Sequence, residues 1–152
     1  MKINDLNPKP DFEKNLKLKE TYVKFEKLLI ELRKRDLPDG PVISINKEID
    51  EMNSTSISGD DMRKSIKKIQ SRVIKLLEKE LKLVPKNYYR NIWTGLGMAA
   101  FGIPIGAAFG SSLGNMAFIG IGLPIGLAIG MAFGSGMDKK AFEEGRQLDI
   151  EI

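Results

Sequence analysis

The clearest pattern in this chain is a run of 47 residues, 91–137, without a charged side chain in an otherwise densely charged sequence. A helix needs about 20 apolar residues to cross the ~30 Å hydrocarbon core of a bilayer. The run can hold two such helices, and the Gly-Ser-Ser-Leu-Gly-Asn stretch at residues 110–115 indicates a turn between them. We therefore predict a transmembrane helical hairpin with spans at about residues 92–110 and 116–137.

Glycine recurs at every fourth position in both halves of this run, so the glycines of each half lie along one helix face. The halves also repeat each other at an offset of 20 residues. Inside a bilayer no hydrophobic force drives helices together, and small residues four apart let two backbones approach closely. This glycine-zipper pattern predicts helix packing, either within one hairpin or also between subunits. The predicted packing residues are Gly102, Gly106, Gly110, Gly114, Gly122, Gly126, Gly130 and Gly134.

Each predicted span contains one proline, Pro104 in the first and Pro124 in the second, at matching places in the repeat. At a rise of 1.5 Å per residue, each proline lies roughly 20 Å from the end of its span that is farther from the turn. A proline inside a helix removes a backbone donor and kinks the helix. We expect two kinks at matched depth. They form a hinge or constriction, or they are the ordinary prolines that membrane helices tolerate.

The residues that flank the run are typical of a membrane interface with a defined orientation. Aromatic side chains precede the first span, positive charges lie on both outer flanks, and the turn carries no charge. The positive-inside rule therefore predicts a multi-pass protein of the cell (inner) membrane with both termini in the cytoplasm. The predicted interface aromatics are Tyr88, Tyr89 and Trp93, and the predicted lipid-headgroup contacts are Lys79, Lys82, Lys86, Arg90, Lys139 and Lys140.

The alternative to a membrane hairpin is a hairpin buried in a soluble core. A water-soluble helix normally keeps a polar face, and neither half of the run has one. The remaining 105 residues are also too charged to cover two apolar helices. The membrane interpretation is therefore favoured.

Outside the run, the hydrophobic pattern predicts helices. Residues 12–35 and residues 61–84 both place apolar side chains four and three residues apart in alternation, which is typical of a coiled coil. Two such stripes predict an antiparallel helical pair within the chain or a bundle formed with other copies. The apolar positions are Leu18, Tyr22, Phe25, Leu29 and Leu32 in the first helix and Met62, Ile66, Ile69, Val73 and Leu76 in the second.

Shorter features lie between and after these helices. A turn is predicted at residues 36–41, a short helix at residues 45–52, and a connector at residues 53–59 with Asp60 as the next N-cap. After the second span the helix should continue to Gly145, a natural C-cap. The last residues alternate polar and apolar side chains, which indicates either a strand or an unstructured tail.

The charge distribution divides the chain into four segments. Residues 1–60 form a nearly neutral arm and linker, residues 61–90 a basic juxtamembrane helix with ten basic against three acidic residues, residues 91–137 the hairpin, and residues 138–152 a tail. The basic helix face fits contact with anionic lipid, or it is a solvated face that sets topology. Nucleic acid is not favoured, because no aromatic stacking platform or recognised motif accompanies the basic residues.

The sequence offers little chemistry for catalysis. It contains no cysteine and no histidine, which removes thiol chemistry, the commonest metal ligand and the usual general base. We recognise no activated nucleophile, carboxylate pair, phosphate-binding loop or metal-ligand cluster. We therefore expect no enzyme, no cofactor and no metal.

The segment from Asn87-Tyr88-Tyr89-Arg90-Asn91 through Gly145-Arg146-Gln147-Leu148 resembles bacterial glycine-zipper membrane hairpin proteins. In these small proteins, Gly-rich spans precede an Asp-Lys-Lys-Ala…Gly-Arg-Gln tail. The resemblance covers residues 87–148 and implies a membrane hairpin that packs through glycines. It implies no catalytic or ligand-binding residue.

These patterns predict an all-α protein with a glycine-zipper transmembrane hairpin and an N-terminal helical, coiled-coil-like cytoplasmic arm. The expected function is that of a membrane-anchored scaffold or adaptor that forms homo-oligomers and binds an unidentified protein partner through the arm. The alternative is an oligomeric pore or channel-like permeability element, although the spans supply little polar lining. Its lining would come from kink carbonyls and from Thr94, Ser111, Ser112 and Asn115.

Overall fold

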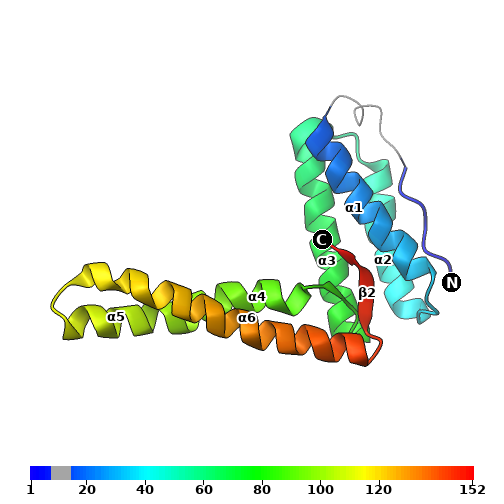
Figure 1. Ribbon diagram of the computed structural model, residues 1–152. Coiled ribbons are helices and arrows are strands. Elements are labelled where there is room, and N and C mark those ends of the chain that lie inside the picture. The colour runs from blue at the N-terminus through cyan, green and yellow to red at the C-terminus, as the bar shows by residue number, and fades with distance from the viewer. Residues whose placement is uncertain (8–14) are drawn as a thin grey trace. The chain divides into compact units, whose positions relative to one another are not determined.

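The computed structural model of the protein describes residues 1–7 and 15–152. The chain forms two compact units, each described by itself below. The first contains Met1–Val84, Leu148–Ile150 and Ile152, and the second contains Pro85–Gln147 and Glu151. The elements in chain order are α1 (Leu16–Arg33), α2 (Asp39–Ser54), α3 (Gly59–Leu81), β1 (Val84–Lys86), α4 (Tyr88–Gly97), the π-helical turn η2 (Met98–Gly102), α5 (Ile103–Ser112), the 3-10 turn η3 (Met116–Phe118), α6 (Ile119–Glu143) and β2 (Gln147–Glu151) (Figure 1).

Three helices build the core of the first unit, where α1 and α2 both pack against α3. The 4-3-4-3 spacing concentrates apolar side chains on one face, and that face is buried within the unit. The predicted stripes therefore supply an intramolecular core, except that Leu76 is only half-buried and the neighbouring Leu77 is fully buried. The most deeply buried of these side chains are Leu18, Phe25, Leu29 and Leu32 of α1, Ile45, Ile49 and Met52 of α2, and Met62, Ile66, Ile69 and Val73 of α3.

Three boundaries in this unit differ from the prediction. Helix α3 ends at Leu81 rather than at residue 84, because Lys82 takes a left-handed backbone conformation with φ +56°, and Val84 begins β1. Helix α2 begins at Asp39, inside the predicted turn, because Pro41 lies in the first helical turn, where a backbone N–H has no intrahelical partner to lose. The N-cap of α3 is Ser58 rather than Asp60. Asp60 instead lies in the first turn, where its negative charge is favourable next to the helix dipole. Of the helix predicted over residues 12–35, residues 12–14 lie outside the described part of the chain.

The second unit contains the predicted helical hairpin. Its first helix runs Tyr88–Ser112 through α4, η2 and α5, and its second runs Met116–Glu143 through η3 and α6. By length and composition, both are able to cross a membrane. Helix α6 packs along α4, η2 and α5, so the two helices lie side by side (Figure 1).

The C-terminal residues settle the alternative between a strand and an unstructured tail. Gly145 ends α6 as predicted: its φ is +68°, its N–H bonds the Phe142 carbonyl at 3.0 Å, and the next N–H bonds the Ala141 carbonyl at 2.8 Å. Strand β2 then pairs with β1 in a two-stranded sheet. Over the described residues 1–7 and 15–152, the protein is therefore mostly helical, and the predicted all-α fold is corrected by the two-stranded sheet of β1 and β2.

Candidate functional site

The two halves of the hairpin meet along glycines, at a separation that larger residues would not allow. A Cβ atom built at Gly134 would lie 2.5 Å from the Cα of Arg90, and one built at Gly126 would lie 2.6 Å from the Cα of Gly102. Side chains at these positions would force the backbones apart. Backbone atoms are also within 3.0 Å of a Cβ built at Gly97, Gly106, Gly122 or Gly130, while the nearest atoms at Gly102 and Gly110 are 3.1 and 3.3 Å away.

Gly97 belongs to this contact, although the four-residue spacing did not predict it. It precedes Gly102 by five residues, which in a regular α-helix would turn it away from the other glycines. The intervening turn η2 is π-helical, and the Ile103 N–H bonds the Met98 carbonyl five residues back. The extra residue in this turn keeps Gly97 on the same face. We call the facing glycines the inner rows: Gly97, Gly102, Gly106 and Gly110 on the first helix, and Gly122, Gly126, Gly130 and Gly134 on α6.

Gly114 was predicted to pack between helices, and the structure corrects this. It follows α5 in the turn, and no atom lies within 4 Å of a Cβ built on it. Its φ is +66°, and the Asn115 N–H bonds the Gly110 carbonyl at 3.0 Å, the bond that closes a Schellman motif. Glycine is required here for its positive φ, which ends the helix, and not for helix contact.

Asp138 closes the open end of the hairpin, and the sequence analysis did not single it out. Its carboxylate accepts hydrogen bonds from the backbone N–H groups of Tyr89 at 3.0 Å and Arg90 at 2.9 Å, and the residue is only 7% exposed. These N–H groups begin α4, whose N-cap Asn87 supplies no side-chain bond. Asp138 thus caps α4 from the opposite helix. The sequence signal for this role is that Asp138 follows Gly134 by four residues, so it continues the inner row of α6 and faces the first helix.

The surface of the hairpin outside the inner rows is apolar. In each membrane-length helix, only 17% of the most hydrophobic stretch of 18 residues is buried inside the protein. A hairpin in a soluble core would show the opposite, with its large side chains covered. The exposed large side chains include Leu96, Phe101, Ile103, Phe109, Ile121, Leu123, Ile125, Ile129, Met131 and Phe133.

The predicted interface aromatics all lie in α4. The rings of Tyr88 and Tyr89 meet edge to face at 5.2 Å, and Trp93 packs against Phe133 of α6 with ring centroids 4.6 Å apart. Trp93 therefore contributes to the contact between the two helices as well as to the surface. A Tyr or Trp ring at a membrane boundary places an apolar body beside a polar tip.

The residues predicted to contact lipid headgroups lie in or next to four elements, α3, β1, α4 and α6. Lys79 lies in the last turn of α3 and Lys82 just after it, Lys86 lies in β1, and Arg90 lies in the first turn of α4. Lys139 and Lys140 are exposed near the end of α6, at 3.8 and 3.9 Å from Glu143 and Glu144. Just beyond them, a hydrogen bond to Glu144 raises the pKa of Arg146 above its ordinary value.

Both prolines lie away from the contact between the two helices. Pro104 is the second residue of α5, directly after the π turn, and Pro124 lies within α6, which continues as helix from Ile119 to Glu143. Each is offset by two residues, about 200°, from inner-row glycines and is exposed. They therefore do not line a space between the two helices of one hairpin.

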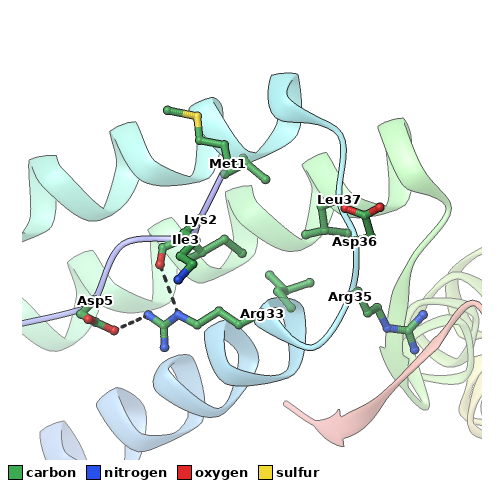
Figure 2. A pocket seen from close by; sticks show the side chains of 10 residues that line it. Met1, Lys2, Ile3, Asp5, Arg33, Arg35, Asp36 and Leu37 are labelled. Carbon is green, nitrogen blue, oxygen red and sulfur yellow. Dashed lines mark hydrogen bonds and ion pairs between the residues drawn. The ribbon is translucent and has the colours of Figure 1, made fainter.

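The first unit contains a cavity of about 410 Å³ beside the C-terminal end of α1. Figure 2 shows its lining, in which the Arg33 guanidinium is bonded to the carbonyl of Ile3 and paired with Asp5. Apolar residues such as Leu32 and Val42 complete the wall. Within the described residues, no group of three His, Cys, Asp or Glu side chains is placed to hold a metal.

Comparison with protein-family models, with curated proteins and with solved structures found no match to this sequence. The resemblance of residues 87–148 to glycine-zipper hairpins therefore stays a prediction from their motifs. The site with the most distinctive geometry is the hairpin itself: glycine backbones inside, large apolar side chains outside, and one buried carboxylate at its open end.

Proposed function

We propose that this protein is anchored in the cell (inner) membrane by its hairpin and acts as a self-associating scaffold or adaptor through its helical arm. The observation that carries the proposal is the apolar surface of the hairpin. Because its helices meet through glycines, nearly all of its large side chains point outward. Exposing apolar surface to water costs about 25 cal/mol per Å², and a bilayer removes that cost.

Extraction of membranes with alkaline carbonate tests the anchor. The full-length protein should stay in the membrane pellet and leave it only in detergent. Replacing the outward-facing Ile125 and Ile129 with Lys should release the protein, because each charge at the centre of a span costs about 2.5–3.5 kcal/mol. The control is Ile43→Lys, at an exposed isoleucine of α2, which should not alter retention. Release of the unaltered protein by carbonate would refute the anchor.

The geometry of the hairpin also supports the proposed orientation. Its two ends meet where Asp138 caps α4 and where Gly134 lies against Arg90. Both flanks of the hairpin therefore leave the bilayer on one side, and they carry the positive charges that mark the cytoplasmic side. Both observations support an arm and two termini that lie in the cytoplasm.

Self-association needs a surface other than the inner rows, because these are occupied within one hairpin. The opposite faces of the two helices carry further small residues, all exposed, and no atom lies within 4 Å of a Cβ built at their glycines. Small residues at this spacing allow close helix contact. We call these the outer rows: Gly95, Ala100, Pro104, Ala108 and Ser112 on the first helix, and Gly120, Pro124, Ala128, Ala132 and Gly136 on α6.

The arm must bind its partners through surfaces other than the apolar stripes, since these form its core. The outward face of α3 carries basic residues and fits contact with anionic lipid headgroups, at about 1 kcal/mol per residue near the surface. The pore alternative has less support, because the Thr94 hydroxyl donates to the Arg90 carbonyl of its own helix at 2.6 Å. The adaptor proposal needs no polar path through the bilayer.

A further inference from the structure

Residues 2–7, which we call the strap, lie extended beside α1 and α2 (Figure 1). All five carbonyl oxygens from residue 2 to residue 6 accept hydrogen bonds from side chains of these helices. A backbone acceptor that leaves water needs such a partner. The bonds are Asn46 Nδ2 to Lys2 at 2.9 Å, Arg33 Nε to Ile3 at 3.2 Å, Arg33 Nη2 to Asn4 at 2.6 Å, Asn53 Nδ2 to Asp5 at 2.9 Å and Tyr22 Oη to Leu6 at 2.6 Å.

Two asparagines of α2, Asn46 and Asn53, bind backbone N–H groups of the strap as well as its carbonyl oxygens. The Oδ1 atoms of Asn46 and Asn53 accept the backbone N–H groups of Asn4 and Asn7, each at 2.8 Å. Asn46 and Asn53 are seven residues apart, a rise of about 10.5 Å along a helix. Three extended residues span about 10 Å, so the two amides match the strap at a repeat of three residues.

Side-chain selectivity in the strap comes chiefly from two positions. Ile3 and Leu6 are each only 7% exposed, whereas the other strap residues are exposed. The groove of α1 and α2 therefore recognises an extended main chain with apolar side chains three residues apart. These are the features of a peptide-binding site, and the strap is the ligand that demonstrably fits it.

We propose that this groove binds the strap of a second copy of the chain, so that neighbouring arms exchange straps in the assembled state. The inference rests on the proposed self-association and names the contact through which the arms take part in it. Every bond described above joins residues 2–7 to residues 22–53, so an identical strap makes the same set. Confinement of copies in a membrane raises the effective concentration, which shifts an exchange toward binding between chains.

Two single-cysteine chains test the exchange, because the protein has no cysteine of its own. One full-length chain carries Asn4→Cys and the other, with a size tag, carries Asp50→Cys. These side chains are 2.9 Å apart and take no part in the carbonyl bonds. Reconstituted together in vesicles and oxidised, they should form a disulfide between chains. The yield should be about tenfold above that with Ser44→Cys, an exposed control on another face of α2.

A strap variant makes the result specific. Ile3→Ser with Leu6→Ser in the Asn4→Cys chain should reduce cross-linking to the level of the Ser44→Cys control, because it removes both apolar contacts and leaves the groove intact. A chain with both cysteines checks that this pair can form a disulfide.

Cross-links confined to single chains would overturn the exchange, as would equal yields with Asp50→Cys and Ser44→Cys. Carbonate extraction of the same vesicles separates the two proposals. Protein that is retained and self-associated by native mass spectrometry, but without interchain cross-links, contradicts the strap exchange alone. Retained protein that is monomeric contradicts the proposed self-association, and released protein contradicts the membrane anchor.

Discussion

At the scale of single residues, the inner rows depend on the absence of a side chain. A methyl group at Gly126 would lie 2.5–2.6 Å from the backbone N and Cα of Gly102, and neither atom moves without moving the helix. At Gly120, on the opposite face, nothing lies within 4 Å. The same chemical change therefore has opposite expected effects at two positions of one helix.

We expect Gly126→Ala to destabilise the hairpin by about 1–3 kcal/mol, the usual cost of overpacking. Gly120→Ala should be neutral or stabilising by up to about 1 kcal/mol, because alanine favours the helix. Unfolding of both variants in detergent, followed by circular dichroism, measures the difference. Equal stability of the two variants would show that the inner-row glycines are not packing residues.

Asp138 provides a second test at this scale. Asp138→Ala removes the carboxylate that caps the start of α4 and should cost about 0.5–2 kcal/mol. Faster hydrogen exchange at the amides of Tyr89 and Arg90 should accompany the loss. The control is Glu143→Gln on an exposed side chain of the same helix. If exchange at these two amides is unchanged, the cap does not hold the end of the hairpin.

At the scale of elements, hydrophobic periodicity predicted most of the helices and the order in which they occur. The apolar faces of α1, α2 and α3 could be predicted because burial of a helix face leaves a repeat in the sequence. The start of α2 and the strand β2 could not be fixed, since a proline in the first turn resembles a turn signal and a short alternating stretch fits two states. The strap left little pattern in the sequence, because most of its hydrogen bonds to the helices use its main chain and only Ile3 and Leu6 are buried.

The π turn could not be predicted for a related reason. A regular four-residue spacing excludes Gly97 from the packing row and includes Gly114. The one-residue insertion between Gly97 and Gly102 is visible only when the second helix shows which faces meet. Sequence alone also cannot tell a glycine needed for close approach from one needed for positive φ.

Deleting one residue tests whether the π turn sets the register. Removal of Ala100 leaves Gly97 and Gly102 four residues apart and should convert the turn to regular α-helix, with thermal stability of the hairpin nearly unchanged. Removal of Ala108 should be strongly destabilising, because it leaves Gly106 and Gly110 three apart and rotates one part of the row by about 100°. Equal losses from the two deletions would contradict this account of η2.

At the scale of the whole molecule, the two faces of each hairpin helix make different contacts in the proposed assembly: the inner rows within one hairpin and the outer rows between copies. Ala128→Leu with Ala132→Leu should reduce self-association, because branched side chains hold neighbouring helices apart. The fold of the single hairpin should be kept, since both residues are exposed. Native mass spectrometry in detergent measures the assembly, with Ile129→Leu as the matched control. Unchanged stoichiometry would remove the outer rows from the assembly contact.

The central claim is that the hairpin crosses a membrane with its turn outside and its arm inside. Single cysteines at Ser112, the last residue of α5, and at Ser56, between α2 and α3, test it most directly. In intact cells, an impermeant thiol reagent should label Ser112→Cys and should label Ser56→Cys only after the membrane is opened. Labelling of Ser56→Cys with protection of Ser112→Cys would reverse the orientation. Equal labelling of both in intact cells would contradict the membrane hairpin.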